Sequence, residues 1–160
     1  MISLRRPEEI LAYRPVQKIL QGKPAVVWSG SPTDSIFTAV TLMNQRNIGF
    51  LVVLEGGELR GVLSERDCAR RVTLSERSPH EVQVSEIMSV NVASAKPTDT
   101  FADCLRIMHD RRVRHLPVLE EHKVVGVISI RDMLAEAVAH HARIITELEL
   151  ERLTMLTSAV

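Results

Sequence analysis

The sequence predicts an α/β (α+β) protein made of two pseudo-twofold-related repeats and a long C-terminal helix. The first observation is a duplicated phrase, because Gly61–Asp67 (GVLSERD) returns as Gly126–Asp132 (GVISIRD) 65 residues later. The second is that the hydrophobic period changes in one order in both copies: short helix, strand, helix, strand, strand, helix. A repeat of this kind seldom buries its apolar face alone, so the copies should pack on each other and any site at their junction should occur twice.

The match extends upstream of the duplicated phrase and sets the domain boundaries. Pro32–Ser35 aligns with Pro97–Thr100, and Leu51–Glu55 aligns with Leu116–Glu120. The polar stretch between the copies carries Pro79 and is typical of a linker. We therefore expect an N-terminal extension over 1–15, repeats over 16–72 and 84–138, a linker over 73–83 and a C-terminal helical extension over 139–160.

The second copy defines the elements of the repeat. Val84 to Met88 forms one apolar helical turn, and Val92 to Ser94 a short strand. A helix follows Pro97, with Thr98 or Asp99 as its cap and with Phe101, Leu105 and Met108 on one face. Two further strands of hairpin spacing complete the unit, over 115–119 and 123–129.

The first copy repeats this pattern, and the chain then continues as a helix. Its predicted strands are 26–28, 50–54 and 59–64, its helix begins at Ile36, and its hairpin turn contains Gly56 and Gly57, which tolerate positive φ. From Ile130 to about Leu156 there is no Gly or Pro, and apolar residues spread around much of the helix. Such a helix is too long for one small half to cover. We expect it to pack on a partner subunit, although its heptads are too imperfect to indicate a two-stranded coiled coil.

The amino-acid composition limits the classes of protein to which the chain can belong. The 160 residues carry no net charge and only three Phe, one Tyr and one Trp, which disfavours nucleic-acid binding. There is no apolar run of about 18 residues and no signal core, so we expect a soluble, cytoplasmic protein that does not bind membranes. Cys68 and Cys104 stand alone in helical patterns and are interpreted as reduced core thiols.

No arrangement of residues points to catalysis or to a metal. The six histidines are scattered, and none stands at ligand spacing from a carboxylate or a cysteine. The pair His140–His141 is expected at the surface. No phosphate-binding loop occurs, and neither Ser64 nor Ser129 has a partner base at any known elbow spacing. We therefore expect a protein that is not an enzyme.

The duplicated phrase places a hydroxyl, a guanidinium and a carboxylate at the start of a helix in each copy. Ser64 and Ser129 can cap these helices, and Asp67 and Asp132 fall in the first turn. One interpretation is purely structural, with Ser and Asp capping the helix and balancing its dipole. The other is a ligand site in which Asp holds a ribose diol while Arg and backbone N–H groups hold a phosphate. Repetition with the Arg included favours the second.

These residues, with the phrase Arg112–Leu119 and the 65-residue period, resemble a tandem pair of CBS domains, the module named after cystathionine β-synthase. The resemblance covers about Val16 to Val138. It is greatest to small stand-alone single-pair CBS proteins, including the plant ones reported to regulate thioredoxins. It implies two β-α-β-β-α units packed sheet to sheet, a disc-like homodimer, and clefts for adenosine ligands. AMP is the foremost candidate, with ADP, ATP, NAD(H) and S-adenosylmethionine as alternatives.

The resemblance also implies the binding residues. Asp67 and Asp132 would bind ribose hydroxyls, with Ser64 and Ser129 beside them and Arg66 and Arg131 near the phosphates. The adenine wall would come from Lys23, Pro24 and Ala25 in one cleft and from Val90, Asn91 and Val92 in the other. Arg114 and His115, which would contact phosphate, are replaced by Gly49 and Phe50 in the first copy. We therefore expect two unequal sites, with the Asp132 cleft the tighter.

Two functions stay open at this point. The first is a regulatory module that senses adenine nucleotides through a change in the angle between halves or subunits. The second is a nucleotide-independent dimeric protein that regulates a redox enzyme such as thioredoxin. The target protein is unknown in both cases, and lack of stabilisation by nucleotides would favour the second.

Overall fold

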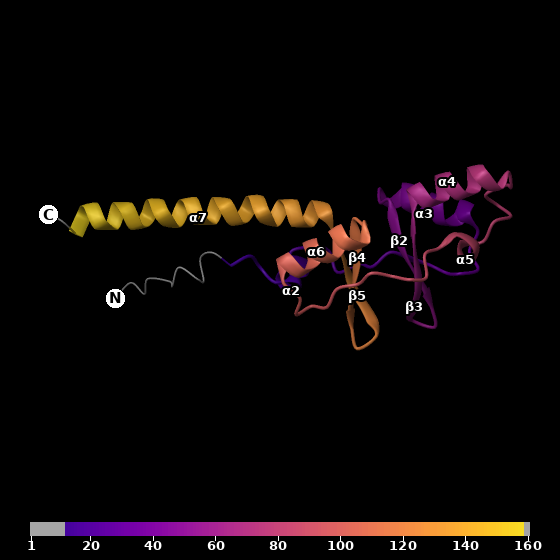
Figure 1. Cartoon of the computed structure of the whole chain (residues 1–160), viewed down its shortest axis with the longest axis horizontal. Coiled ribbons are helices and arrows are strands. Elements are labelled where there is room, and N and C mark those ends of the chain that lie inside the picture. Colours follow the sequence, from indigo (N-terminus) through magenta and orange to yellow (C-terminus); the bar gives the residue numbers. More distant parts are fainter. Residues whose placement is uncertain (1–11, 159–160) are drawn as a thin grey trace.

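The computed structural model describes residues 12–158 and shows two similar halves side by side, with one long helix projecting from them (Figure 1). The first half holds β1 (Ser29–Gly30), α3 (Ile36–Arg46), β2 (Phe50–Glu55), β3 (Glu58–Ser64) and α4 (Glu65–Ser75). The second holds α6 (Phe101–Arg111), β4 (His115–Glu120), β5 (Lys123–Ser129) and the start of α7 (Ile130–Ser158). Two short helices, α2 (Val16–Gln21) and α5 (Val84–Ile87), precede the halves. The predicted α/β class and the duplication are confirmed.

The two sheets share one antiparallel hairpin and differ at one edge. In the first half the order is β1-β2-β3, with β1 parallel to β2 and β2 antiparallel to β3. The second half has only β4 and β5, and each hairpin shifts register at the equivalent place, after Val53 and after Val118. The strand predicted over 92–94 is wrong: a single bridge joins Ala95 to Val118 instead.

The first-copy edge strand also lies later than predicted. Apolar character favoured residues 26–28, whereas the paired residues are Ser29 and Gly30, opposite Val52 and Val53. Both errors have the same cause. An edge pairing of one or two residues is fixed by where the chain meets the sheet, and the hydrophobic pattern of a three-residue stretch does not specify that place.

Polar caps fix the helix starts. Ser35 Oγ accepts a hydrogen bond from Thr38 N at 3.1 Å to begin α3. In the second half the cap of α6 is Thr100, so the prediction of Thr98 or Asp99 is wrong. Thr100 and Asp103 form a reciprocal capping box. The Asp99 carboxylate accepts instead from Lys96 N in the preceding turn, at 2.8 Å.

Each short helix completes the core of the half that does not follow it directly. Val16 of α2 packs in the second core, and Val84 and Ile87 of α5 pack in the first. Each also lies against a strand glycine. A Cβ at Gly61 would meet Met88 Sδ at 2.8 Å and Ser89 O at 2.9 Å, and one at Gly126 would meet Leu20 Cδ2 at 2.7 Å. The halves are therefore interlocked.

The two cysteines occupy one core each, as predicted. Cys68 and Cys104 are buried and free of disulfides. Burial raises the pKa of the Cys68 thiol to about 11 and that of Cys104 to about 12, with neighbouring carboxylates adding to the rise. A thiol with such a pKa stays protonated and unreactive at neutral pH.

The first turns of α7 lie against the second half and bury a histidine that was predicted to be exposed. His140 is only 3% exposed, and its ring lies 4.1 Å from the ring of Tyr13. Tyr13 in turn stacks on Phe101, and Glu136 accepts from Arg14 N and from Arg143. The prediction failed for His140, though not for His141, because contact with a distant segment decides which face of a helix is buried.

The remainder of α7 extends away from the body (Figure 1). Several of its apolar side chains are more than half exposed, namely Ile145, Leu148, Leu150, Leu153 and Leu156. Within the described part of the chain, no helix combines the length and apolar character required to span a bilayer.

Candidate functional site

A cleft of about 1420 Å³ runs between the two halves. It is lined by both β-hairpins, by the segments that follow α2 and α5, and by the first residues of α4 and α7. Of the residues predicted for the two sites, all but Val90 and Asp132 line this cleft: Lys23, Pro24, Ala25, Ser64, Arg66, Asp67, Asn91, Val92, Arg114, His115, Ser129 and Arg131. Val90 is instead 70% exposed at the surface.

Asp132 is not among the residues that line the cleft, and its partly exposed side chain is held in a network of hydrogen bonds. Its Oδ2 accepts from Ser129 N at 2.7 Å and from Ser129 Oγ at 2.8 Å. The same oxygen accepts from Lys23 Nζ at 2.7 Å, and Lys23 also donates to Val127 O at 2.9 Å. Lys23, predicted as part of an adenine wall, is therefore an ion-pair partner of the carboxylate predicted to bind ribose.

Asp67 has the same helical position and a different environment. Ser64 Oγ donates to Asp67 Oδ2 at 2.5 Å and accepts from Asp67 N at 3.2 Å. Among residues 12–158 no cation is paired with Asp67. The residue that follows α5 where Lys23 follows α2 is Asn91, which accepts from Arg111 at 2.9 Å. The two Ser–Asp pairs therefore have different surroundings, and one difference is Lys23, which we expected in an adenine wall.

The pseudo-twofold axis passes between Phe50 and His115. These residues hold equivalent places at the start of β2 and β4, and their rings stack with centroids 4.6 Å apart and planes 13° apart. Burial lowers the pKa of His115 below its ordinary value near 6.5. Asp132 opposes this shift, while Lys23, Arg131 and Arg114 add to it.

The lowered pKa of His115 predicts acid sensitivity of the fold. A group whose folded pKa is depressed contributes stability above its unfolded pKa, about 6.5, and loses it as pH falls through the folded value. We expect the melting temperature to fall as the pH drops below about 6.5. In His115→Phe, which copies the residue at position 50, this part of the fall should be absent. Thermal scans from pH 5 to pH 8 test this, and an unchanged pH profile in the variant would assign the acid sensitivity to other groups.

Four cleft arginines, including Arg111 of α6, have no carboxylate partner within the described part of the chain. Arg66 and Arg131 begin α4 and α7, and Arg114 precedes β4. Ion pairs between an arginine and a carboxylate are formed elsewhere by Arg60, Arg77, Arg106 and Arg143. The cleft therefore carries more basic than acidic side chains beside two helix N-termini, an arrangement suited to anions.

Sequence reasoning missed several residues of the cleft. Trp28 lines it, with the Arg46 guanidinium 4.2 Å from its ring centroid, and Val26, Val27 and Val127 add apolar wall. The sequence pattern predicts a strand at Trp28, whereas β1 begins one residue later. Its position just before β1 and its rarity in a chain with one tryptophan were the available signals.

Fold and cleft together define a duplicated α/β module with a Ser–Asp pair at each of two helix starts, of which Ser64, Asp67 and Ser129 line the cleft between its halves. The family model for the CBS domain matches residues 29–73 and 84–139. The chain belongs to the CBS domain family, whose modules are regulatory.

Relatives of the same family agree with this assignment. The CBS domain-containing protein YhcV of Bacillus subtilis is 32% identical over 112 residues, covering 70% of this chain and 79% of that protein. The mitochondrial CBS domain-containing protein CBSX3 of Arabidopsis thaliana is 33% identical over 125 residues, which cover 75% of this chain and 58% of that protein.

Solved structures share the fold. The CBS domain NE2398 matches with a TM-score of 0.75 and 39% identity, over 78% of this chain and 98% of that one. The CBS domain pair of MJ0100, solved in complex with 5′-methylthioadenosine and S-adenosyl-L-methionine, matches with a TM-score of 0.66 over 77% of this chain and 94% of that one. Its identity of 23% shows likeness of fold alone.

Proposed function

We propose that this chain is a regulatory module that binds an adenine nucleotide between its halves and acts without catalysing a reaction. The observation that carries the proposal is the duplicated Ser–Asp pair, each at a helix N-terminus beside unpaired arginines. A carboxylate accepts two vicinal hydroxyls well, and a helix start with arginine binds phosphate. AMP is the first candidate, with ADP, ATP, NAD(H) and S-adenosylmethionine as alternatives.

Each part of the ligand has matching groups in the cleft. Asp67 and Asp132 would take ribose hydroxyls, and Arg66, Arg114 and Arg131 would take phosphate. Pro24, Ala25 and Val92 lie in the cleft wall and would cover the adenine. A ligand held by both halves can change their angle only if the two arrangements bind it with different affinity. That difference in affinity would couple ligand binding to a change in the angle between the halves.

The experiment is calorimetry of the purified chain with AMP and adenosine, preceded by mass spectrometry of any ligand that copurifies. Micromolar AMP binding with a rise in melting temperature at saturation supports the proposal. Absence of both binding and stabilisation would contradict it, and would leave the second candidate function, a nucleotide-independent protein that regulates a redox enzyme such as thioredoxin.

The exposed apolar face of α7 favours an assembly in either case. Leu134, Val138, Ile145 and Leu148 are all more than half exposed and repeat at helical spacing. Such a face is stable in water when another surface covers it. We propose that it is covered by a second copy of the chain, giving a homodimer.

Removing the residues after Arg143 is expected to weaken this dimer. The cut keeps the Arg143–Glu136 pair and so leaves the second half intact. The truncated chain should sediment as a monomer at concentrations where the full chain is dimeric, because the apolar contact of α7 is lost. If both chains sediment alike, the distal part of α7 is not the interface.

A further inference from the structure

A single line of side chains runs along α7 on the side that faces away from the second half. It advances by four and three residues in turn, which is the spacing of a heptad core. Its members are Leu134, Val138, His141, Ile145, Leu148, Arg152 and Met155, and all seven are exposed. Glu136 and His140, on the opposite side of the helix, are buried against the second half. We call the line of seven the α7 stripe.

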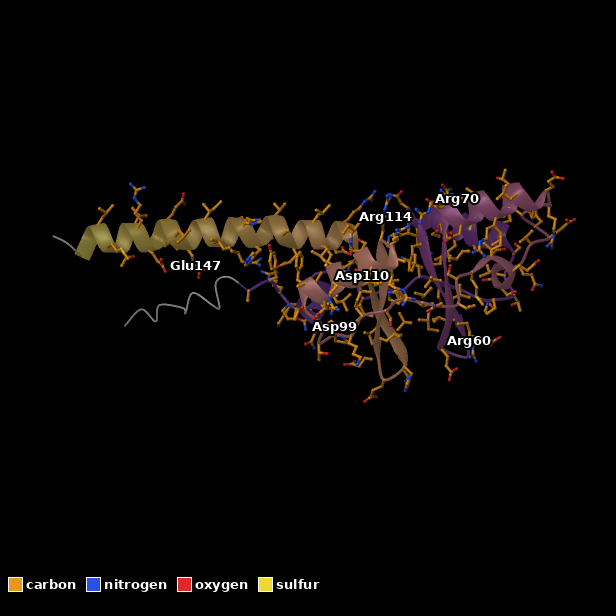
Figure 2. The ribbon with its side chains drawn as sticks, in the orientation of Figure 1. Arg60, Arg70, Asp99, Asp110, Arg114 and Glu147 are labelled. Atoms are coloured by element: carbon orange, nitrogen blue, oxygen red, sulfur yellow. The ribbon has the colours of Figure 1, made fainter. Side chains whose placement is uncertain are left out.

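The α7 stripe continues past the two halves of the protein. Figure 2 labels Glu147 on the part of α7 that projects beyond both halves, and the stripe runs from the first turns of this helix to its last (Figure 1). A second helix can therefore lie along the stripe without displacing any part of the second half. Five of the seven residues are apolar, so such a contact removes apolar surface from water. The two polar members, His141 and Arg152, determine the direction of that contact.

Two α7 helices paired in parallel would place each stripe residue beside its own twin. The two Arg152 guanidinium groups would then meet at a core position, which loses water when helices pair. Like charges at such a position repel each other, and a polar or charged residue in a helix core sets the register of the pair. The stripe therefore disfavours parallel pairing.

Reversing one helix removes this conflict in a single register. The cross-helix pairs in that register are Ile145 with Leu148, Val138 with Met155, and His141 with Arg152. Apolar residues then meet apolar residues, and the two polar residues meet each other. A shift of one heptad in either direction would instead set Arg152 against a leucine, Leu134 or Leu148. Every pair occurs twice about a twofold axis, as an interface between identical surfaces requires.

The acidic residues beside the stripe fit the same register. Glu149 lies one turn before Arg152 on the same helix, where opposite charges attract each other. Across the contact, Glu149 faces Ala142 of the second copy, and Glu151 faces Ile144. No two carboxylates of the described part of α7 are therefore brought together by antiparallel pairing.

We propose that two copies of the chain pair antiparallel through the α7 stripe, so that the last turns of each helix lie on the first turns of the other. This inference rests on the homodimer proposed above and adds its direction and register. Val138 and Met155 are about 25 Å apart along one helix, which sets the length of the contact. Met155 of the second copy would lie about two turns from Arg131, which lines the cleft. A shift of this helix start on ligand binding would therefore move the end of the second copy's helix.

Cross-linking of the full chain tests the direction. Chains that carry Val138→Cys or Met155→Cys, one of them tagged, are produced together and treated with a short bismaleimide reagent. Antiparallel pairing should link one variant to the other and neither variant to itself, because identical positions then lie about 25 Å apart. The intact chain is the background control, since Cys68 and Cys104 are buried in the cores.

A matched pair of leucine variants tests the surface. Leu148 belongs to the α7 stripe and Leu150 does not, although the two side chains are equally accessible, at 58% and 57%. In sedimentation experiments Leu148→Asn should raise the dissociation constant of the dimer at least about tenfold, because both copies lose a buried leucine. Leu150→Asn should dimerise as the intact chain does.

The outcomes separate this inference from the proposed function. A dimer in which each cysteine variant links only to itself would overturn the antiparallel arrangement and leave the homodimer standing. A dimer without links, or equal losses in the two leucine variants, would show that the α7 stripe is not the interface. An intact chain that sediments as a monomer would contradict both the homodimer and this inference, while nucleotide binding would still be decided by calorimetry.

Discussion

Replacing Asp132 by alanine is expected to weaken AMP binding in its cleft about 10- to 100-fold, the effect of losing one or two hydrogen bonds to a charged group, on the order of 1.5 to 3 kcal/mol. The carboxylate is held in place by Ser129 N and Ser129 Oγ, so it is preorganised for a ribose diol. Calorimetry of the purified variant measures the loss. Asp67→Ala should affect a separate site, and unchanged AMP binding in both variants would remove the ribose assignment.

Lys23→Gln is the variant to compare with Asp132→Ala, because Lys23 and a ribose hydroxyl would compete for the Asp132 carboxylate. The ion pair is partly buried, at 2.7 Å, and must loosen if Asp132 turns to a ligand. Adenosine affinity in this cleft should therefore rise a few-fold in the variant. A large fall in adenosine affinity would instead mean that Lys23 holds the ligand or the cleft shape directly.

Replacing Gly61 by alanine is expected to destabilise the fold by about 1 to 3 kcal/mol, the usual range for overpacking a filled site. The new Cβ would lie 2.8 Å from Met88 Sδ and 2.9 Å from the Ser89 carbonyl oxygen. Met88 can move aside, but Ser89 O accepts from Val62 N at 3.0 Å and is fixed by that bond. Thermal unfolding should show a fall of about 2 to 10 °C in melting temperature.

Gly126→Ala is the matched control at the twin position. There the nearest atoms belong to Leu20, at the flexible end of a side chain, with no backbone atom among them. Its melting temperature should fall less than that of Gly61→Ala. Equal losses in the two variants would show that the side chains of α2 and α5, rather than the Ser89 backbone, set the tolerance.

Much of this fold can be predicted from local sequence patterns. Hydrophobic period and caps predict the two hairpins, α3, α5 and the extent of α7. Because the sequence is duplicated, the elements predicted in one copy could be compared with those in the other. The edge strands and the burial of His140 were predicted wrongly, because they depend on contacts between distant segments. The cap at Thr100 was also predicted wrongly, although its capping box with Asp103 is local. His140 is buried by Tyr13, more than a hundred residues away in the chain, and nothing near it in sequence indicates that contact.

The site shows the same division. Pattern and resemblance together named residues that the structure brings into one cleft, because the equivalent starts of α4 and α7 both lie at the junction of the two repeats. The ion-pair partner of Asp132 could not be predicted from the sequence. Lys23 meets that carboxylate only because α2 docks on the second half, a contact 109 residues apart in sequence.

That docking arrangement has a consequence for how the chain is made. During synthesis α2 leaves the ribosome before both halves, yet its place in the second core exists only after β5 and the start of α7 have followed more than a hundred residues later. The first half likewise waits for α5. Neither half can reach its final form alone, so the two should mature in one late, concerted step. In a crowded polysome, the waiting α2 of one chain can also dock on the second half of a neighbouring one, which gives exchanged dimers a direct route of formation.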